Sequence, residues 1–139
     1  MRLVSLAALL VVFLYLPSKT AGSKSRITEQ PDISRSGTDF LSVCSNIGHE
    51  ANTNSPPTYN EAVCLGWVEG FREGFTVHDE LLGVPQRDRM VCMPRGVTTI
   101  QAIRVIEKYI TDNPAKAHRL TRYNASVALA RAFPCKAGK

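Results

Sequence analysis

The sequence predicts an all-α protein: a compact bundle of four main helices, arranged as two helical hairpins and stapled by two disulfides. Apolar residues recur every three or four positions in several segments, and no segment alternates convincingly with a period of two. Two capping-box patterns, over 58–61 and 98–101, mark helix starts. The chain has 139 residues and 4 cysteines, a length that suits one domain and an even cysteine count that suits two disulfides.

Residues 1–22 have the pattern of a cleaved secretory signal. A charged start, Arg2, precedes an uncharged apolar run over 3–16, and small residues permit cleavage after Gly22 or after Ser23. A membrane anchor is the alternative interpretation, but the apolar run is shorter than the roughly 20 residues that a membrane span needs. We therefore expect an exported protein that has no membrane span after cleavage.

After the signal we expect a flexible polar N-terminus over 23–37 and a helical domain over 38–139. Thr38 is expected to cap the first helix, and Gly48 is expected to end it. The apolar side of this helix consists of Phe40, Leu41, Cys44 and Ile47.

The second helix begins at the capping box over 58–61 and ends at Gly83. Gly66, Gly70 and Gly74 lie on one side of it, although each glycine costs roughly 1 kcal/mol relative to alanine in a helix interior. The expected reason is close backbone approach by another helix or by a partner. The apolar stripe of this helix consists of Cys64, Trp67, Val68, Phe71, Phe75, His78 and Leu82.

A long loop from Gly83 to Gly96 precedes the third helix, which starts at the second capping box and stops by Asn113 because Pro114 follows. Asn113 and Pro114 are expected to begin the fourth helix, which ends near Phe133. The buried side of the third helix consists of Ala102, Ile103, Ile106, Tyr109 and Ile110. The stripe of the fourth helix consists of Leu120, Tyr123, Val127 and Ala130.

Antiparallel hairpins favour one of the three possible disulfide connectivities. Cys44 lies about one turn before the end of the first helix and Cys64 lies less than two turns into the second, so the two positions face each other. Cys92 stands just before the third helix and Cys135 just after the fourth, which again makes them neighbours. We predict the bonds Cys44–Cys64 and Cys92–Cys135.

The sequence lacks the residue constellations that enzymes and metal sites need. The three histidines, His49, His78 and His118, share no metal-type spacing, and no H-E-x-x-H, G-x-S-x-G or P-loop motif occurs. His78 falls on the apolar stripe of the second helix and is interpreted as a core or edge residue. We therefore expect no enzyme, no bound metal and no cofactor.

Charge is modest overall but unevenly distributed. The net charge of +5 is too small to argue for nucleic acid binding. Residues 27–86 hold two arginines against nine acidic residues, whereas residues 87–139 hold eleven lysines and arginines against three acidic residues. The two halves either pack together with solvated outer faces or steer a charged protein partner. In the acidic half, Asp79-Glu80 and the Glu69/Glu73 pair are interpreted as solvated helix faces.

Four motifs follow one another along the domain. They are Phe40-Leu41-x-x-Cys44, Cys64-x-Gly66-Trp67-Val68-x-Gly70-x-x-x-Gly74, Cys92-x-Pro94-x-Gly96-Val97-Thr98-x-x-Gln101 and Ala128-x-x-x-Ala132-Phe133-Pro134-Cys135. In this order they strongly resemble the Rap/Tai family of periplasmic immunity proteins associated with type VI secretion. The resemblance runs from about Thr38 to Cys135, and the matching cysteines, glycines and aromatic residues are mostly structural.

The resemblance implies an exported, all-helical protein, commonly a homodimer, in the periplasm of a Gram-negative bacterium. It implies that the protein protects its producer from a toxic peptidoglycan amidase, a Cys/His hydrolase, by plugging the active-site groove of that effector. A general periplasmic interaction or chaperone-like module with the same fold is the alternative function.

The residues themselves favour one contact surface, the loop 86–93 together with the exposed start of the third helix. A disulfide at Cys92 tethers this loop, and a tethered loop loses less entropy on binding than a free one. An ordinary solvated connection is the alternative interpretation. The residues expected to contact the partner are Gln86, Arg87, Asp88, Arg89 and Met90, which offer charge and an adaptable apolar side chain.

Overall fold

The computed structural model describes residues 30–47 and 56–135, and the predicted signal over 1–22 lies outside these ranges. In the described part of the chain there are four α-helices and no strand, so the predicted all-α class is confirmed. The helices are α1 (Gly37–Cys44), α2 (Tyr59–Leu81), α3 (Thr99–Asp112) and α4 (Thr121–Ala132). Two short 3-10 helices, η2 (Gln86–Asp88) and η3 (Pro114–Lys116), lie in the connections.

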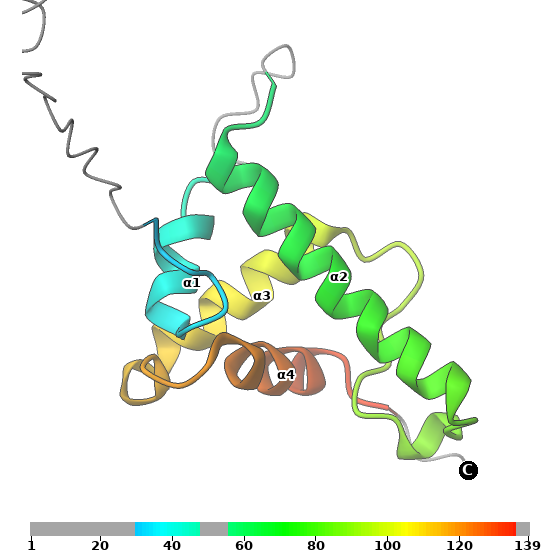
Figure 1. Ribbon diagram of the computed structural model, residues 1–139. Coiled ribbons are helices and arrows are strands. Elements are labelled where there is room, and N and C mark those ends of the chain that lie inside the picture. The colour runs from blue at the N-terminus through cyan, green and yellow to red at the C-terminus, as the bar shows by residue number, and fades with distance from the viewer. Residues whose placement is uncertain (1–29, 48–55, 136–139) are drawn as a thin grey trace, which may run out of the picture.

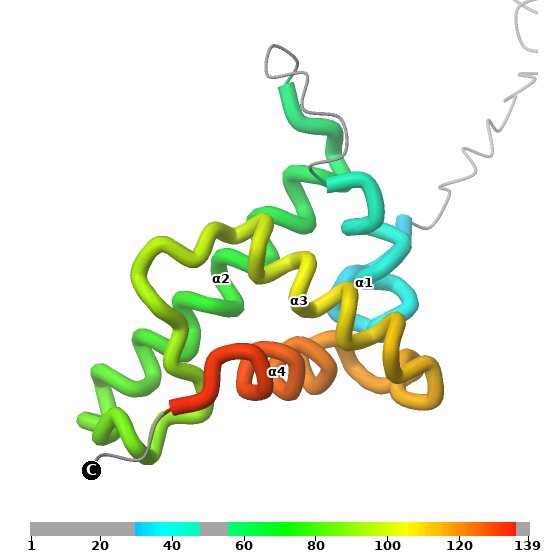
Figure 2. Tube along the Cα trace, turned by 180° about the vertical axis from the view of Figure 1, so that it is seen from behind, coloured from blue at the N-terminus to red at the C-terminus, as the bar shows by residue number. Residues whose placement is uncertain are grey.

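The long helix α2 forms one side of the molecule, and α1, α3 and α4 group beside it (Figure 1). Helix α3 is the central element because it packs on α1, α2 and α4. Figure 2, which views the molecule from behind, shows the start of α3 crossing α2. The predicted hairpins are present as the packed pairs α1–α2 and α3–α4. The largest fully buried side chains are Phe40, Ile103, Ile106, Ile110, Leu129 and Val68.

The third helix agrees closely with the prediction from sequence. Thr98 is its N-cap, and the Thr98 hydroxyl accepts a hydrogen bond from the Gln101 N–H at 3.1 Å. The helix ends at Asp112, with Asn113 as its C-cap. All five residues predicted on its buried side are buried. Apolar periodicity reports burial well here because three other helices cover this element.

The start of α2 is the capping box predicted from the sequence. Glu61 N–H donates to Thr58 Oγ1 at 3.3 Å, and Thr58 N–H donates to a Glu61 carboxylate oxygen at 2.6 Å. The bond from Thr58 N–H holds the pKa of Glu61 below its usual range. The helix ends at Leu81, and Gly83 follows with φ of +60°, a left-handed conformation that glycine adopts without steric cost.

The apolar stripe predicted for α2 is correct along its first part and wrong at its end. Trp67 stacks on Phe71 with 4.9 Å between ring centroids, on the side that packs against the core. His78 and Leu82 are exposed, however, and Asp79 is buried in their place, so Asp79 is not on a solvated face. The last turns of α2 face the connection between α2 and α3 rather than the apolar core. Apolar periodicity therefore does not predict which residues are buried there.

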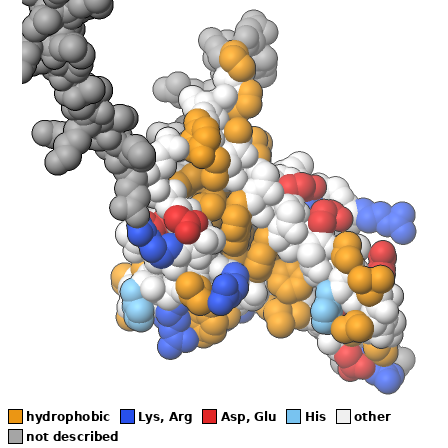
Figure 3. Space-filling view, viewed as in Figure 1, with side chains coloured by type: hydrophobic (Ala, Val, Ile, Leu, Met, Phe, Trp, Pro, Cys, Tyr) orange, Lys and Arg blue, Asp and Glu red, His pale blue; other side chains and the backbone are white. Residues whose placement is uncertain are grey.

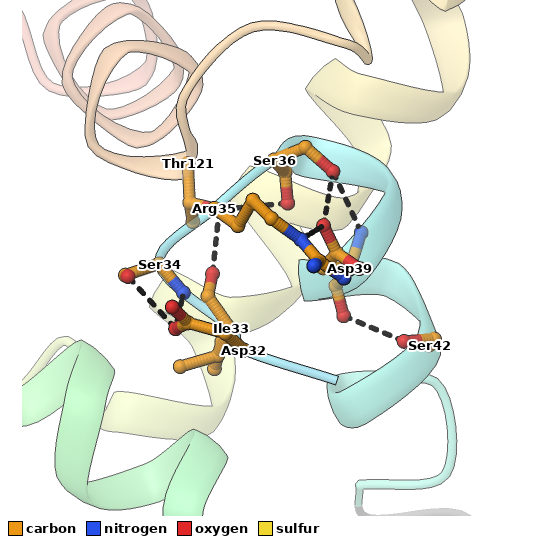
Figure 4. A network of polar contacts seen from close by, with 8 residues as sticks. All are labelled: Asp32, Ile33, Ser34, Arg35, Ser36, Asp39, Ser42 and Thr121. Atoms are coloured by element: carbon orange, nitrogen blue, oxygen red, sulfur yellow. Dashed lines mark hydrogen bonds and ion pairs between the residues drawn. The ribbon is translucent and has the colours of Figure 1, made fainter. Parts of the chain in front are cut away.

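The start of α1 differs from the prediction, because Ser36 and not Thr38 is the N-cap. Ser36 Oγ accepts a hydrogen bond from Asp39 N–H at 3.2 Å and donates one to the Asp39 carboxylate at 2.6 Å (Figure 4). These two bonds favour a start two residues earlier than Thr38. The helix ends at Cys44, before the predicted end, and Gly48 lies outside the described residues.

Helix α4 begins later than predicted. Asn113 and Pro114 start η3, and α4 itself starts at Thr121. Leu120 and Tyr123, which were predicted to be buried, are exposed. The buried residues of α4 are Thr121, Asn124, Ala125, Ala128 and Leu129, whereas Val127 and Ala130 are half-buried.

Two buried polar side chains explain why the prediction for α4 chose the wrong face. Thr121 Oγ1 lies 2.6 Å from the Ile33 carbonyl oxygen and 2.7 Å from the Ser36 carbonyl oxygen (Figure 4). Asn124 Nδ2 donates to the Arg119 carbonyl oxygen at 3.1 Å. The Thr121 hydroxyl supplies a donor to the buried Ile33 carbonyl, and Asn124 shares the Arg119 carbonyl with the N–H of Gly37. The end of the segment predicted as the flexible N-terminus, including buried Ile33, thus packs on α4.

Both predicted disulfides are confirmed. Cys44 bonds Cys64 with 5.5 Å between Cα atoms, and Cys92 bonds Cys135 with 4.9 Å. The bonded residues are 20 and 43 positions apart in the sequence. In the chain-entropy model, loops of these lengths stabilise the fold by about 3 and about 4 kcal/mol.

The predicted close approach of another helix to the glycines of α2 is wrong within the described chain. A Cβ atom built on Gly66, Gly70 or Gly74 would meet no atom within 4 Å. All three glycines are exposed, on the side of α2 that faces away from the core. The energetic cost of these glycines is therefore not offset by packing with the described residues.

Candidate functional site

The connection from α2 to α3 carries all five residues predicted to contact a partner. It leaves α2 at Gly83, forms η2 at the far end of the molecule and returns beside α2 to the start of α3 (Figure 1). The five predicted residues, 86–90, lie at and just after η2, so the structure brings them together in one short segment.

A first anchor for this segment lies at its start, where the chain folds back on α2. The carboxylate of Asp79 lies 3.7 Å from Arg89 Nε and 3.1 Å from His78 Nδ1. Arg89 Nε also donates to the Val84 carbonyl oxygen at 3.2 Å. Val84 N–H in turn donates to the Asp79 carbonyl oxygen at 2.8 Å. These contacts connect Asp79, Val84 and Arg89 to one another and so fix the turn that follows α2.

A second anchor lies at the end of the segment. Val91 is buried, and Cys92 N–H donates to the Phe133 carbonyl oxygen at 2.9 Å. The Cys92–Cys135 disulfide joins the same point to the chain after α4. The segment 86–90 is therefore held at both ends.

Between the anchors, the predicted contact residues differ in what they present to solvent. The side chain of Arg87 is 71% exposed, and it lies 3.6 Å from the Asp88 carboxylate. Met90 is 58% exposed, and Gln86 is exposed as well. Arg89 differs from the others because it is engaged by Asp79 and by the Val84 carbonyl. Gln86, Arg87, Asp88 and Met90 thus face solvent, and the Arg89 side chain, 39% exposed, is at the same time bound to Asp79.

The start of α3, predicted as part of the same surface, is joined to α2. Thr99 Oγ1 accepts a hydrogen bond from Arg72 Nη1 at 3.1 Å and donates to the Glu69 carboxylate. Glu69 and Arg72 form an ion pair at 3.0 Å, so Glu69 is not a free acidic group. Ile100 and Gln101 are exposed beside them.

A groove of about 720 Å³ runs between the last turns of α2, the returning chain and the end of α4. The amino-acid pattern does not predict this groove. The one signal in the sequence is the i, i+4 spacing that puts Asp79 on the same side of α2 as Phe75. Residues that line the groove include Phe75, Asp79, Arg89, Val91, Phe133 and Pro134.

Hydrophobic side chains also reach the surface. In Figure 3 they gather along the seam between α2 and the side of the molecule formed by α1 and α4, and again at the far end of α2. Val77, Leu81 and Leu82 are exposed at that end. Surfaces of this kind are typical of proteins that bind other proteins.

The described residues do not assemble a metal centre. No group of three or more His, Cys, Asp or Glu side chains in 30–47 and 56–135 has the arrangement to hold a metal ion. The four cysteines are joined in disulfides. His78 lies beside Asp79, and His118 is exposed in the connection between η3 and α4, whereas His49 lies outside the described ranges. Within the same ranges, no helix is long and apolar enough to cross a membrane.

Three further residues of the sequence motifs, Pro94, Gln101 and Phe133, lie near the connection from α2 to α3. Pro94 is exposed and lines the groove, and Gln101 N–H contributes to the cap of α3. Phe133 is the C-cap of α4 and supplies the carbonyl that holds Cys92.

Fold and site together define a small, disulfide-stapled helical protein whose distinctive feature is an exposed, doubly anchored loop, as expected for a binding protein. The chain belongs to the family of Rap1a immunity proteins, whose sequence model matches residues 36–135. The resemblance seen in the four motifs is therefore confirmed, and the family implies immunity against a secreted effector protein. No match to the chain was found among curated proteins or among solved structures.

Proposed function

We propose that this protein is exported to the periplasm of a Gram-negative bacterium, where it binds and inhibits a peptidoglycan amidase effector of a type VI secretion system. Membership of an immunity family and two disulfides support an exported inhibitor. Inhibition occurs by occlusion of the active-site groove of the effector, and the protein itself turns over no substrate.

The observation that carries this proposal is the loop 86–90, exposed between two anchors. Held at both ends, it loses little conformational entropy when it enters a groove of a partner. Arg87 offers hydrogen bonds and charge, and Met90 offers a flexible apolar contact that adapts to the surface it meets. The exposed residues Ile100 and Gln101 at the start of α3 extend the same surface.

The test is affinity capture from a periplasmic extract of the producing bacterium with the oxidised mature protein. We expect recovery of one Cys/His amidase whose activity falls to zero at near-equimolar inhibitor. The variant Arg87→Glu/Met90→Ala should weaken this inhibition at least about ten-fold, because it reverses the charge of one outward-facing side chain and removes the apolar contact of another. Arg122→Glu, which makes the same charge change at an exposed site on α4, is the matched control and should inhibit normally.

Two results would count against the proposal. Capture of many unrelated proteins, with suppression of their aggregation, would favour a general periplasmic interaction or chaperone-like module. A captured amidase that the Arg87→Glu/Met90→Ala variant inhibits as well as the natural protein would show that the effector is bound elsewhere.

We also propose that the protein forms a homodimer through the glycine side of α2. Apolar and glycine residues on this side have the same spacing when read from either end of the helix, centred on Gly70. An antiparallel pair of identical helices crossing at Gly70 would therefore place Tyr59 opposite Leu81, and Gly66 opposite Gly74, of the second copy. The residues in this series are Tyr59, Val63, Gly66, Gly70, Gly74, Val77 and Leu81.

Sedimentation velocity of the purified protein tests this dimer. We expect a dimer for the natural sequence and a monomer for Gly70→Leu, because a large side chain at the crossing point separates the two helices. Arg122→Glu should sediment like the natural protein. A monomer at all concentrations for the natural sequence would exclude the dimer and leave the immunity proposal intact.

A further inference from the structure

Asp79 is an unusual residue in this fold. It is the one buried charged residue of the described chain, 7% exposed, and it lies in the last turns of α2, where its helix neighbours His78 and Glu80 are exposed. Burial of a carboxylate is costly unless other groups compensate it. The groups around Asp79 therefore indicate what this burial achieves.

Those groups belong to the partner-facing loop and to its own helix. Arg89 Nε lies 3.7 Å from one Asp79 oxygen, and His78 Nδ1 lies 3.1 Å from the other. The backbone of Asp79 accepts the N–H of Val84, whose own carbonyl accepts Arg89 Nε at 3.2 Å. Side chain and backbone of Asp79 thus hold both ends of the turn 84–89.

We propose that Asp79 is a positioning residue that holds the loop 84–90 in its partner-binding conformation through Arg89. This inference rests on the proposed function, in which the loop contacts an effector. Asp79 does not face the partner, and Arg89 serves the loop rather than the partner. The disulfide at Cys92 fixes the other end of the same loop, so that Arg87 and Met90 are presented outward between two fixed points.

Amide hydrogen exchange of the natural protein and its variants tests the role of Asp79 without a partner. The N–H groups of Asp88 and Arg89 are hydrogen-bonded within the turn, and the N–H of Val84 is hydrogen-bonded to the Asp79 carbonyl. In Asp79→Asn they should exchange about ten-fold faster, while the amides of α3 exchange at the natural rate. Glu80→Gln, the matched control at the exposed neighbouring acid, should change neither set.

A second variant separates positioning from a general structural role. If Asp79 acts through Arg89, then Arg89→Gln should accelerate the same amides, and the double variant Asp79→Asn/Arg89→Gln should be no faster than the faster single variant. Additive acceleration, faster exchange in α3 or unchanged exchange in the turn would each overturn the proposal.

The effector recovered by capture provides the functional measurement. Asp79→Asn should bind it about ten-fold more weakly, because the loop must then be ordered on binding. Unchanged affinity with a loosened loop would overturn the positioning role in recognition. If the natural protein captures no effector, the proposed function fails, whereas the exchange measurements still decide whether Asp79 orders the loop.

Discussion

Gly37 and Asn124 approach each other so closely that a side chain at position 37 would have no room. A Cβ atom built on Gly37 would lie 2.8 Å from Asn124 Nδ2 and 3.0 Å from the Ala117 carbonyl oxygen. Gly37 N–H donates to the Arg119 carbonyl oxygen at 3.0 Å, and Asn124 Nδ2 bonds the same oxygen. The start of α1 therefore packs directly on the segment that leads into α4.

This contact predicts that Gly37→Ala destabilises the fold. The new methyl group would lie too close to the Ala117 carbonyl oxygen and to the buried side-chain amide of Asn124, at a cost of about 1–3 kcal/mol. Gly66→Ala is the matched control: no atom of the same copy lies within 4 Å of its Cβ position, so at concentrations where the protein is monomeric this change should stabilise α2 by up to about 1 kcal/mol. Urea denaturation of both variants measures the difference, and equal stabilities would contradict the packing described for Gly37.

How far the sequence predicts this fold depends on whether apolar contacts or polar contacts decide the position of an element. The disulfides and the buried side of α3 follow from helix periodicity and hairpin geometry, and they were predicted correctly. The packing of α1 on α4 depends on Gly37, Thr121 and Asn124. A prediction from amphipathic periodicity assigns such small and polar residues to the surface. The predicted stripe of α4 was wrong for that reason.

The candidate site shows the same division. The sequence places the loop 86–90 beside a disulfide, because Cys92 is visible as half of a pair. It does not show that Arg89 contacts Asp79, since these residues are brought together only when the chain turns back at Gly83. Which residues of the loop face a partner, and which face the protein, therefore follows from the folded turn.

Thr121→Val should destabilise the protein by about 1–3 kcal/mol, because it leaves the buried carbonyl group of Ile33 without its hydrogen-bond donor. The Ser36 carbonyl keeps the N–H of Phe40 at 2.9 Å. Valine has nearly the volume of threonine, so the loss reports hydrogen bonding rather than packing. Ser126→Ala removes a comparable bond, to the Arg122 carbonyl at 2.8 Å, from an exposed site and should cost much less. Unfolding free energies of the two variants give the comparison, and a Thr121→Val protein as stable as Ser126→Ala would contradict it.

The two disulfides should have different effects when removed. Cys44→Ala/Cys64→Ala removes a fully buried bond between α1 and α2 and should lower global stability by about 3 kcal/mol or more. Cys92→Ala/Cys135→Ala should lower it by about 4 kcal/mol and also release the loop 86–90. Hydrogen exchange at Asp88 and Arg89 distinguishes them: it should be faster, relative to the exchange of α3, only in the second variant. Equal relative exchange in both would show that the disulfide does not restrain the loop.

Acid should weaken the start of α1 through Asp39. Hydrogen bonds from Arg35, and then from Ser36, hold the pKa of Asp39 below its usual value of 3.8. A carboxylate with a lowered folded pKa contributes stability above its unfolded pKa, and this contribution is lost as pH falls through the folded pKa. Because Arg35 is largely exposed, the contribution is at most about 1 kcal/mol.

Urea denaturation between about pH 5 and pH 2 measures this contribution. The variant Asp39→Asn should lose less stability than the natural protein over this range, because the titrating group is gone. Arg35→Gln should show an intermediate loss, since Ser36 still bonds the carboxylate. If Asp39→Asn and the natural protein lose stability in parallel, then Asp39 is not linked to folding, and the acid sensitivity of the protein arises from other carboxylates.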